Sequence, residues 1–502
     1  MPHKPSRIGS GVLRGVDAVP VTVEVRIGGP QGTPKVLGLA DNGVREALFR
    51  ILGAFSSQDL PMPRGVPTIS LTPATIPKSG SGFDLPMALA LGSAGGIVTI
   101  PPSLAALGEV SLGGDILPTP GIVAVALAAR EQGWTDLLTA PSTARIAALV
   151  PGIRAFGAGT LREAFDWIRG ELKLAPAEPP PPDRDELHPD LAEIRGHETP
   201  KRALMVAAAG RHNLLMVGPP GSGKSALAKR LPGILPPTSD TEALEILKIH
   251  TIHGSLLQPL GRRRPIRSPH HTSSVASLLG GGRDPRPGEV SLSQHGVLFL
   301  DELPEFRREV IEGLRQPLED GHLSVGRVRQ TVTMPADFLL VCTMNPCPCG
   351  YHGHGLRACT CSPAQRQRYR ARVSGPMLDR LDLQVEVPNV APETYTAPQD
   401  TAWSTEQIAQ QVQVATERQQ SRSAVPNARL REGDLEQAIG TAVDVHRTLE
   451  TILRTYRLSG RSRVRLLRIS RTLADLDDRD DVLSDDLLVA ARLRGAIQGS
   501  GI

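Results

Sequence analysis

The chain of 502 residues is predicted to be an α/β protein of several domains, and three observations lead to this class. Strand-like and helix-like segments alternate through residues 1–174, as they do in α/β units. An apolar run at 214–217 ends in a glycine-rich loop that opens into a basic helix. From residue 399 to 502 the periodicity is helical. At roughly 100 to 200 residues per domain, we expect about three domains.

The composition restricts which side chains can form the core and which partners the charge can indicate. Hydrophobic residues make up 40% of the chain but aromatic residues only 3%, so the core must rest on aliphatic side chains. The formal net charge of +4 is too small to indicate a nucleic-acid partner by itself. The N-terminus shows no apolar signal region, and Pro101 and Pro102 break the uncharged stretch 85–108. We therefore expect a cytoplasmic protein without a membrane span.

The first expected unit, residues 1–174, interleaves strands with helices and contains no nucleotide-binding pattern. Strands are expected at 21–27, 66–71, 109–112 and 136–139, and helices at 42–55, 84–91, 122–131 and 143–149. Residues 175–190 then change composition abruptly, with four consecutive prolines at 179–182. Consecutive prolines favour an extended, semi-rigid spacer, so this stretch is the clearest domain boundary.

The second expected unit, residues 191–398, contains a phosphate-binding pattern, G-x-x-x-x-G-K-S, placed between a strand and a helix. Glycines let backbone N–H groups turn toward a phosphate, and the helix start adds partial positive charge. Lys224 would reach the β and γ phosphates of ATP, and the Ser225 hydroxyl would bind Mg²⁺. The alternative is an ordinary Gly/Pro turn. The predicted nucleotide-binding residues are Gly218, Pro219, Pro220, Gly221, Ser222, Gly223, Lys224, Ser225 and Ala226.

Two later strands end in the polar groups that a hydrolytic site needs. The apolar run 296–300 delivers Asp301, expected to hold Mg²⁺ through water, and Glu302, expected to polarise the attacking water. The run 338–344 ends in Asn345, which can orient that water without adding charge. Each run alone could be a core strand with a polar end, but their order favours an ATP hydrolase.

Between these strands lie inserted segments. Residues 238–295 form an unusually long connection with a glycine-rich stretch at 279–289, expected to be a loop or hairpin tip. His270 and His271 lack a third ligand at helical spacing, so polar loop residues are favoured over a metal site. A helix is expected at 305–318, and 322–334 alternates like a hairpin with Arg327 and Arg329 at its tip.

Four of the five cysteines fall within fifteen residues, as two C-x-C pairs. In a cytoplasmic chain such a cluster is more often a metal site than a set of disulfides. Structural Zn²⁺ is therefore the favoured interpretation, while a redox-labile pair and plain loop cysteines stay open as alternatives. Cys342 is expected to be a strand residue. The predicted ligands are Cys347, Cys349, Cys359 and Cys361.

The last expected unit, residues 399–502, is helical, with candidates at 404–420, 432–456, 462–476 and 484–497. Just before it, Arg380 could pair with Asp379 or Asp382, or act as an arginine finger on a neighbouring subunit's γ-phosphate, which would imply an oligomer. Arg461 lies at a helix start and could contact the γ-phosphate from this lid.

The front unit resembles the Lon-protease-like domain of ribosomal-S5-type fold that precedes magnesium-chelatase-related ATPases. The residues that carry this resemblance are 77–90 and 108–118. Lon-type peptidases use a Ser nucleophile and a Lys, but those positions fall on Gly82 and Val125, so we expect no peptidase activity. Lys78, Ser79 and Ser81 lie nearby and are expected to form a solvated polar turn.

Nearly the whole chain resembles the magnesium-chelatase-like AAA+ ATPase family. The resemblance rests on the front unit and on residues 267–272, 287–289, 296–306, 344–350 and 375–380. It implies a hexameric ring driven by ATP hydrolysis, with Asn345 as sensor 1, Arg380 as the finger and Arg461 as sensor 2. Some members are DNA helicases that promote branch migration during natural transformation.

Two functions compete for this shared motor. One is translocation on single-stranded or branched DNA, with Arg327, Arg329 and the loop 280–288 gripping phosphates in a central pore. The other is a chelatase-type or chaperone-type motor that remodels a protein partner. Hairpin arginines also serve subunit contacts, so they do not separate the two. Intact Glu302 and Arg380 argue against a third possibility, a non-hydrolysing ATP switch.

Overall fold

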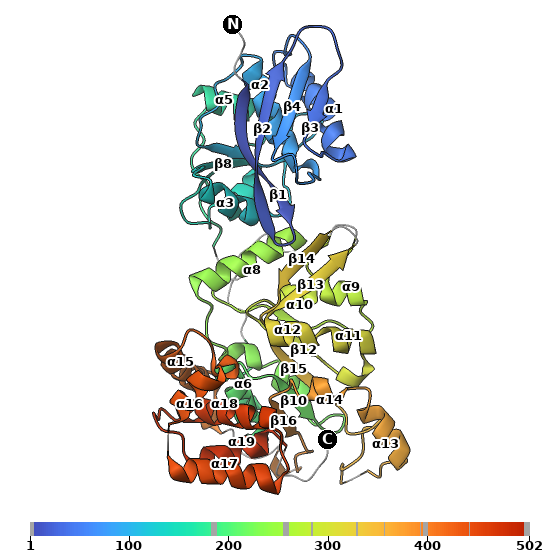
Figure 1. Ribbon diagram of the computed structural model, residues 1–502, viewed down its shortest axis with the longest axis vertical. Helices are drawn as coiled ribbons and strands as arrows, with labels where there is room; N and C mark the ends of the chain where they lie inside the picture. Colours follow the sequence, from blue (N-terminus) through green and yellow to red (C-terminus); the bar gives the residue numbers. More distant parts are fainter. Residues whose placement is uncertain are drawn as a thin grey trace.

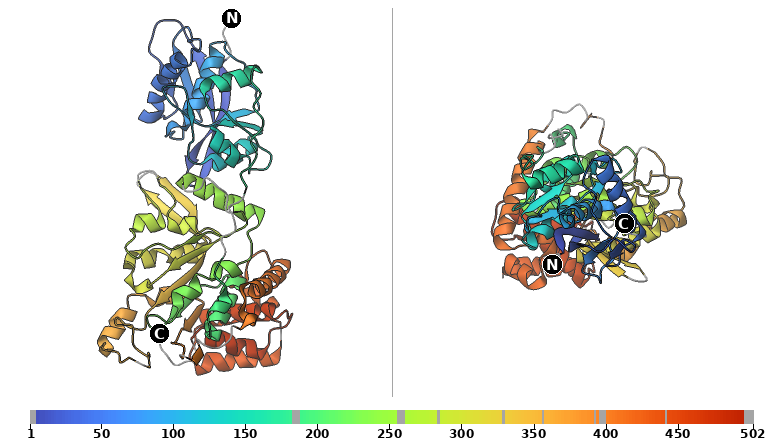
Figure 2. Two further views of the ribbon diagram at one scale, coloured as in Figure 1. Left: turned by 180° about the vertical axis from the view of Figure 1, so that it is seen from behind. Right: turned by 90° about the horizontal axis from the view of Figure 1, so that it is seen from above.

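The computed structural model describes residues 5–181, 188–254, 261–282, 285–327, 330–355, 357–391, 393–394, 400–440 and 442–495. Three units follow one another along the long axis (Figure 1). The front unit lies at one end, a unit built on a parallel sheet lies in the middle, and a helical unit lies beside that sheet at the other end, an order also seen from behind (Figure 2). No described helix has the length and apolar character needed to cross a membrane.

The front unit is a seven-stranded sheet in the order β3-β4-β2-β1-β5-β8-β9. Its centre is a long antiparallel hairpin of β1 and β2, and β5, β8 and β9 then add in parallel. A separate short hairpin joins β6 to β7. The strands are β1 Ser6–Arg14, β2 Asp17–Ile27, β3 Lys35–Leu37, β4 Pro67–Thr72, β5 Leu104–Ala106, β6 Glu109–Val110, β7 Ile116–Leu117, β8 Asp136–Thr139 and β9 Arg154–Gly157.

The helices of the front unit are α1 Asn42–Ser57, α2 Asp84–Ala94, α3 Ile122–Glu131, α4 Pro141–Ala147 and α5 Leu161–Arg169. The expected elements are confirmed, although the strand expected at 109–112 is shorter. Several further elements were not predicted, among them β1, β3, β9 and α5. In β1, a Cβ at Gly9 would lie 2.5 Å from the Trp134 ring, and a Cβ at Gly11 would lie 3.1 Å from Val125. With glycine at these two positions, β1 has no regular alternation of apolar side chains that would predict a strand.

The expectation of a solvated turn around Lys78 is wrong. Lys78 is fully buried, and its Nζ donates a hydrogen bond to the carbonyl oxygen of Pro73. The Lys78 backbone N–H donates to the Leu39 carbonyl, and the Lys78 carbonyl accepts from the Asp41 N–H. These two bonds hold Lys78 at the edge of the sheet. Burial lowers the pKa of the Lys78 ammonium. The Ser81 hydroxyl donates instead to the Glu109 carboxylate.

The middle unit is built on a parallel sheet in the order β11-β12-β15-β10-β16. The three central strands, β12, β15 and β10, are buried throughout because helices cover both faces, which explains their continuous apolar runs. The strands are β10 Leu214–Val217, β11 Ile266–Arg267, β12 Val297–Leu300, β15 Leu339–Met344 and β16 Leu383–Glu386. A hairpin of β13 His322–Arg327 and β14 Gln330–Pro335 confirms the alternating pattern at 322–334.

The helical segments of the middle unit are shorter than expected in two places. The expected helix 305–318 is divided into α11 and α12, because Gly313 packs on Leu279 and Pro317 offers no backbone N–H. The helix after the phosphate loop ends at Ala228 and continues as a 3₁₀ turn. The segments are α6 Glu198–Gly210, α7 Lys224–Ala228, η3 Leu231–Ile234, α8 Asp240–His253, α9 Val275–Leu279, α10 Glu289–Leu292, η4 Leu303–Glu305, α11 Arg308–Gly313, α12 Arg315–Asp320, α13 Pro363–Arg370 and α14 Gly375–Leu378.

The last unit is helical, as expected, but the helix predicted at 432–456 is broken at Gly440, which has a φ of +79°. The Thr472 hydroxyl of α18 forms a hydrogen bond of 2.8 Å with the His212 ring. This bond holds the helical unit against the segment before β10. The helices are α15 Thr405–Arg422, α16 Glu432–Ile439, α17 Val443–Thr455, α18 Gly460–Leu476 and α19 Ser484–Leu493.

The front unit is docked on α8 of the middle unit (Figure 1). The Gly121 N–H at the start of α3 donates to the Thr251 carbonyl at 3.1 Å, and Lys248 pairs with Asp17 at 2.6 Å. Apolar residues of both units form one buried cluster there: Val16, Ala124, Ile249, Ile252 and Leu292. Such a shared apolar cluster holds the two units together more firmly than the ion pair does.

Candidate functional site

The glycine-rich loop 218–223 leaves the carboxyl end of β10 and enters α7. Only glycine fits at 218, because a Cβ there would lie 2.2 Å from the Val387 carbonyl oxygen. Gly221 and Gly223 have φ values of +77° and +91°, a region that side chains disfavour. The turn therefore needs its glycines, as the pattern predicted.

Lys224 is folded into this loop and is 9% exposed. Its Nζ donates to the carbonyl oxygens of Gly218 and Pro219 at 2.6 and 2.8 Å and to Asn345 Oδ1 at 3.3 Å. Burial lowers the pKa of Lys224, and the nearby carboxylates Asp301 and Glu302 oppose that shift. The ammonium thus lies at the centre of the loop, and no carboxylate among the described residues pairs with it directly.

The predicted Mg²⁺ residues also meet. Ser225 Oγ lies 3.0 Å from Asp301 Oδ2, across the gap between α7 and the end of β12. Thr343 completes this cluster, since its hydroxyl donates to Asp301 and accepts the Glu302 backbone N–H at 3.0 Å. Thr343 was not predicted. It is the penultimate residue of β15, and only the strand order places it beside β12.

Asn345 and Glu302 complete this edge of the sheet. Asn345 follows β15, the strand next to β10, and the Gly218 N–H donates to the neighbouring Met344 carbonyl at 3.2 Å. Glu302 has a left-handed backbone with a φ of +56°, an unusual conformation that is common at functional sites. The five predicted groups of one chain therefore lie at one sheet edge: Lys224, Ser225, Asp301, Glu302 and Asn345.

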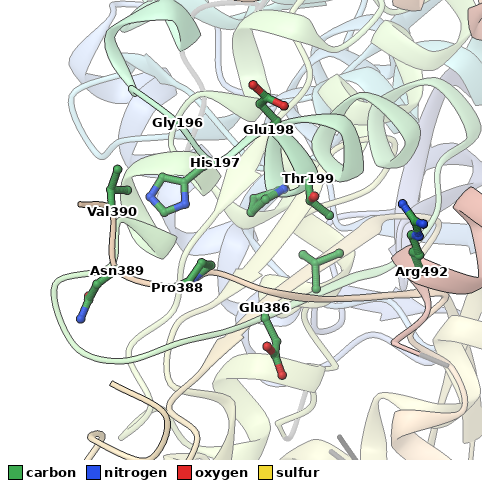
Figure 3. Close-up of a pocket in the computed structure, with 11 residues that line it drawn as sticks. Gly196, His197, Glu198, Thr199, Glu386, Pro388, Asn389, Val390 and Arg492 are labelled. Atoms are coloured by element: carbon green, nitrogen blue, oxygen red, sulfur yellow. The ribbon is translucent and has the colours of Figure 1, made fainter. Parts of the chain in front are cut away.

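A cavity of about 420 Å³ adjoins the loop (Figure 3). One wall is the 196–200 segment at the start of α6, and His197 faces the loop, since a Cβ at Gly223 would lie 3.8 Å from its Nε2. The opposite wall comes from residues 385–390 and from Arg492 of α19. Burial, aided by Lys201, lowers the pKa of His197. Arg492 and the segment 388–390 carry no recognisable sequence pattern, so they were not predicted.

Arg380 lies away from this cluster. Its carbonyl oxygen accepts from Asn213 Nδ2 at 3.1 Å, and Asn213 precedes β10, so Arg380 lies at the amino-terminal edge of the parallel sheet. The guanidinium pairs with Glu319 of α12 and donates to the Pro376 carbonyl at 2.6 Å. It pairs with neither Asp379 nor Asp382, which were the sequence-based alternatives.

Arg461 is exposed in the first turn of α18. One helical turn later, Arg465 pairs with Asp382 at 3.3 Å, at the amino-terminal edge of the sheet. The structure therefore does not bring Arg461 to the phosphate loop of its own chain. Arg329 and the side chain of Arg327 lie outside the described residues.

The four clustered cysteines come together beside the loop. Their sulfur atoms all lie within 4.8 Å of one another, and they are the one group among the described residues arranged to hold a metal ion. The arrangement is compatible with a structural zinc site. His270 and His271 are loop residues whose rings stack 4.1 Å apart, with His270 bonded to Thr272. Cys342 is buried in β15, as predicted.

The parallel sheet, the glycine-rich loop and the carboxylates at the strand ends define the class as a phosphate-loop nucleotide-binding protein. Three family models match: "Magnesium chelatase, subunit ChlI" at residues 190–395, "Subunit ChlI of Mg-chelatase" at 21–143 and "Magnesium chelatase, subunit ChlI C-terminal" at 402–494. The chain belongs to the magnesium-chelatase-like AAA+ family.

Similar proteins span nearly the whole chain. The uncharacterized protein YifB of Salmonella typhimurium is 38% identical over 488 residues, which cover 96% of this chain and 95% of YifB. Competence protein ComM of Haemophilus influenzae is 36% identical over 498 residues, 96% of each chain. The uncharacterized protein Rv2897c of Mycobacterium tuberculosis is 37% identical over 502 residues, 97% of this chain and 98% of that protein.

Proposed function

We propose that this protein is a ring-forming AAA+ ATPase of the cytoplasm that couples ATP hydrolysis to DNA translocation, most specifically as a branch-migration helicase in natural transformation or recombination. The observation that carries the proposal is the division of the catalytic groups between two edges of one sheet. Lys224, Asp301 and Asn345 meet at the carboxyl edge, while Arg380 lies at the opposite edge. One copy of the chain cannot bring all four to one phosphate.

The residues present fit ATP and Mg²⁺. Lys224 and the loop N–H groups supply positive charge for phosphate oxygens, and Ser225 with Asp301 supplies the oxygen ligands that Mg²⁺ prefers. Ser222 adds independent support, because its hydroxyl is buried in the loop without a hydrogen-bond partner in the described structure. A buried polar atom without a partner favours a ligand at that place.

Each group then has a task. Glu302 would take a proton from the attacking water, and its position is fixed by the backbone bond to Thr343 at 3.0 Å. Asn345 would orient that water while Lys224 holds the phosphates. The 420 Å³ cavity beside His197 would receive the base. Bound Mg²⁺ would neutralise charge that develops on the phosphates.

Assembly follows from Arg380. A guanidinium at the edge away from its own phosphate loop can act only on a nucleotide held by a neighbour, which favours a closed ring, and we propose a homohexamer. Arg461 lies near the same edge, so we propose that it too serves a neighbouring site as sensor 2. The proposed units are a Lon-like domain at 1–174 without catalytic Ser and Lys, a linker at 175–190, an AAA+ core at 191–398 and a lid at 399–502.

DNA as the substrate is supported by the similarity to competence protein ComM, which spans nearly the whole chain. Two features could contact a strand in a central pore: the β13–β14 hairpin that carries Arg327 and Arg329, and the loop closed by the bridge between Gly281 and Arg286. The alternative, a motor that remodels a protein partner, is favoured by the matches to the magnesium chelatase subunit.

The proposal is tested by measuring ATP hydrolysis with and without single-stranded or branched DNA at two salt concentrations. Strong stimulation that falls at the higher salt is expected, because phosphate contacts release counterions. An oligonucleotide displacement assay on a branched substrate then reports helicase activity. ATP hydrolysis that ignores DNA but responds to a protein fraction would favour the alternative motor.

A further inference from the structure

We propose that Cys347, Cys349, Cys359 and Cys361 bind one Zn²⁺ ion, and that the bound ion holds the segment 345–350 against the phosphate loop, so that nucleotide affinity depends on zinc. The second half of this proposal rests on nucleotide binding at the loop, as proposed above. The first half stands on the cysteine geometry alone.

The sulfur positions fit a tetrahedral ion. Cys347 Sγ lies 3.4 Å from Cys349 Sγ and 3.7 Å from Cys359 Sγ, and the last two are 3.6 Å apart. Four sulfurs around zinc at about 2.3 Å are separated by about 3.8 Å, close to these values. A disulfide would need about 2.05 Å, and all four cysteines are free. The sulfur atoms are therefore spaced as metal ligands rather than as disulfide partners.

The surroundings also suit a thiolate site. The Cys349 backbone N–H donates to Cys361 Sγ at 3.4 Å, the kind of second-layer bond that orients metal-bound sulfur. Cys347 is fully buried, while the other three are partly exposed, so an ion has a path of entry. The two C-x-C pairs are separated by nine residues, so one ion would close a loop of the chain.

The first cysteine pair is tied to the phosphate loop by direct contact. Gly350 has a φ of +82°, and a Cβ there would lie 2.6 Å from both Cγ and Cδ of Pro220. Its N–H donates to the Cys347 carbonyl at 2.9 Å, which closes the turn around the first pair. Asn345, two residues before Cys347, accepts from Lys224. Fixing the turn therefore fixes one wall of the loop.

The second pair reaches the same place by another path. Cys361 comes just before Ser362, the N-cap of α13, and Arg366 of that helix donates to the Cys361 carbonyl at 3.2 Å. The same helix carries Tyr369, which is buried in one apolar cluster with Met344, the residue before Asn345. An ion that joins the two cysteine pairs would therefore link α13 to the end of β15, where Asn345 lies.

Metal analysis of the full-length protein tests the site. We expect about one zinc and no iron per chain, lost in Cys359→Ser/Cys361→Ser and kept in Cys342→Ala, whose cysteine lies in β15. Wild-type protein that stays without zinc after incubation with Zn²⁺, or that holds iron instead, overturns the assignment. Because wild-type protein is measured, the result does not depend on whether the variant folds.

The coupling is tested by titrating a fluorescent ATP analogue into wild-type protein as purified, after removal of zinc with a chelator, and after zinc is restored. We expect affinity to fall about fivefold or more on removal and to recover on restoration. Unchanged affinity in zinc-free protein overturns the coupling while leaving the site. If even the zinc-loaded protein does not bind the analogue, the proposed function fails, and the zinc content still decides the site.

A pair of glycine variants isolates the contact itself. Gly350→Ala places a methyl group against Pro220 and should weaken nucleotide binding while zinc content stays near one. Gly353→Ala is the matched control, because its φ is +76° but nothing lies within 4 Å of its Cβ position. Both carry the same backbone strain, so only the first tests the contact. Equal nucleotide affinities of the two variants overturn the role of Gly350.

Discussion

At the scale of single residues, steric exclusion of side chains shapes the phosphate loop as much as hydrogen bonding does. Gly218 faces a carbonyl oxygen and Gly350 faces a proline ring, so neither position tolerates a side chain. Lys224 folds into the loop and donates to three oxygen atoms. The loop is therefore preorganised around one ammonium group.

Lys224→Ala is expected to weaken ATP binding by roughly 10- to 100-fold or more, because the phosphates lose a charged donor. Equilibrium binding of a fluorescent ATP analogue measures this. Lys229→Ala is the matched control, since Lys229 is exposed just after α7 and should bind normally. Normal binding by Lys224→Ala would contradict the assignment of the loop.

Arg380→Ala is expected to bind ATP normally but to lose hydrolysis by about 10³-fold. Glu302→Gln should also bind without turnover, for a different reason, since its base is missing. In rings mixed from equal amounts of the two variants, roughly a quarter of the interfaces pair an intact Glu302 with an intact Arg380. Steady-state hydrolysis by the mixture should therefore recover in part. No recovery in rings shown to contain both variants would contradict a finger supplied by the neighbour.

The site residues differ in how well sequence identifies them. Asp301 and Asn345 each follow an apolar strand, and Lys224 follows the glycine-rich loop, so a local pattern marks all three. Thr343 and Arg492 have no such mark, because their place in the site depends on which strands are neighbours and on where α19 packs. Local patterns thus predict the groups that follow strands, and tertiary packing decides the others.

At the scale of elements, α8 joins two units. Ile249 and Ile252 of this helix are buried against the front unit, whereas Lys248 on the same helix forms an ion pair at the rim. Ile249→Ala should lower the free energy that holds the units together by about 2–5 kcal/mol, because it removes buried methyl groups and leaves a cavity. Hydrogen exchange of α3 and α8 amides measures the opening. Lys248→Ala should cost less than about 1 kcal/mol, and equal effects would contradict an apolar junction.

His250 of α8 makes stability depend on pH. Burial lowers its pKa from 6.5 to about 4, with smaller effects from Arg267 and His253 that act in the same direction. Because the folded protein keeps this ring neutral, its stability is fully present above pH 6.5 and is lost as the pH falls toward 4. From pH 7 to pH 5 the loss should be about 2 kcal/mol in urea unfolding.

The variant His250→Gln supplies the control for this pH dependence. Glutamine can still donate to the Leu292 carbonyl, which the ring contacts at 3.0 Å, but it does not titrate. The difference in stability between wild type and variant should therefore change between pH 7 and pH 5. A constant difference would contradict a buried neutral histidine.

Elements were predicted best where apolar residues repeat regularly. The helix 122–131 and the strand 136–139 have the expected bounds. Strand β1 was not predicted because Gly9 and Gly11, which lie against Trp134 and Val125, interrupt its apolar pattern. The helix 305–318 was predicted too long because its periodicity continues past Gly313. In both cases a contact distant in sequence decides the local structure.

At the scale of the whole molecule, the sequence predicts three units but not their arrangement. The apolar residues of α8 are indistinguishable in pattern from those of any core helix, so nothing in the sequence showed that they receive the front unit. The proline-rich stretch 175–190 stays the predicted boundary, whereas the contact between the front and middle units is made at α8. The segment that joins the two units in the sequence is therefore not the segment that holds them together in space.

The docking of the front unit on α8 has a mechanical consequence. Strand β1 runs from Ser6 to Arg14, and at its inner end a Cβ on Gly15 would touch Val332 of the hairpin. Nine extended residues span about 30 Å, so the outer end of this strand lies far from the pivot. A small tilt of α8 during an ATPase cycle would displace that outer end through a much longer arc. The front unit would thus amplify the motion of one helix into a displacement large enough for a single-molecule distance probe to follow.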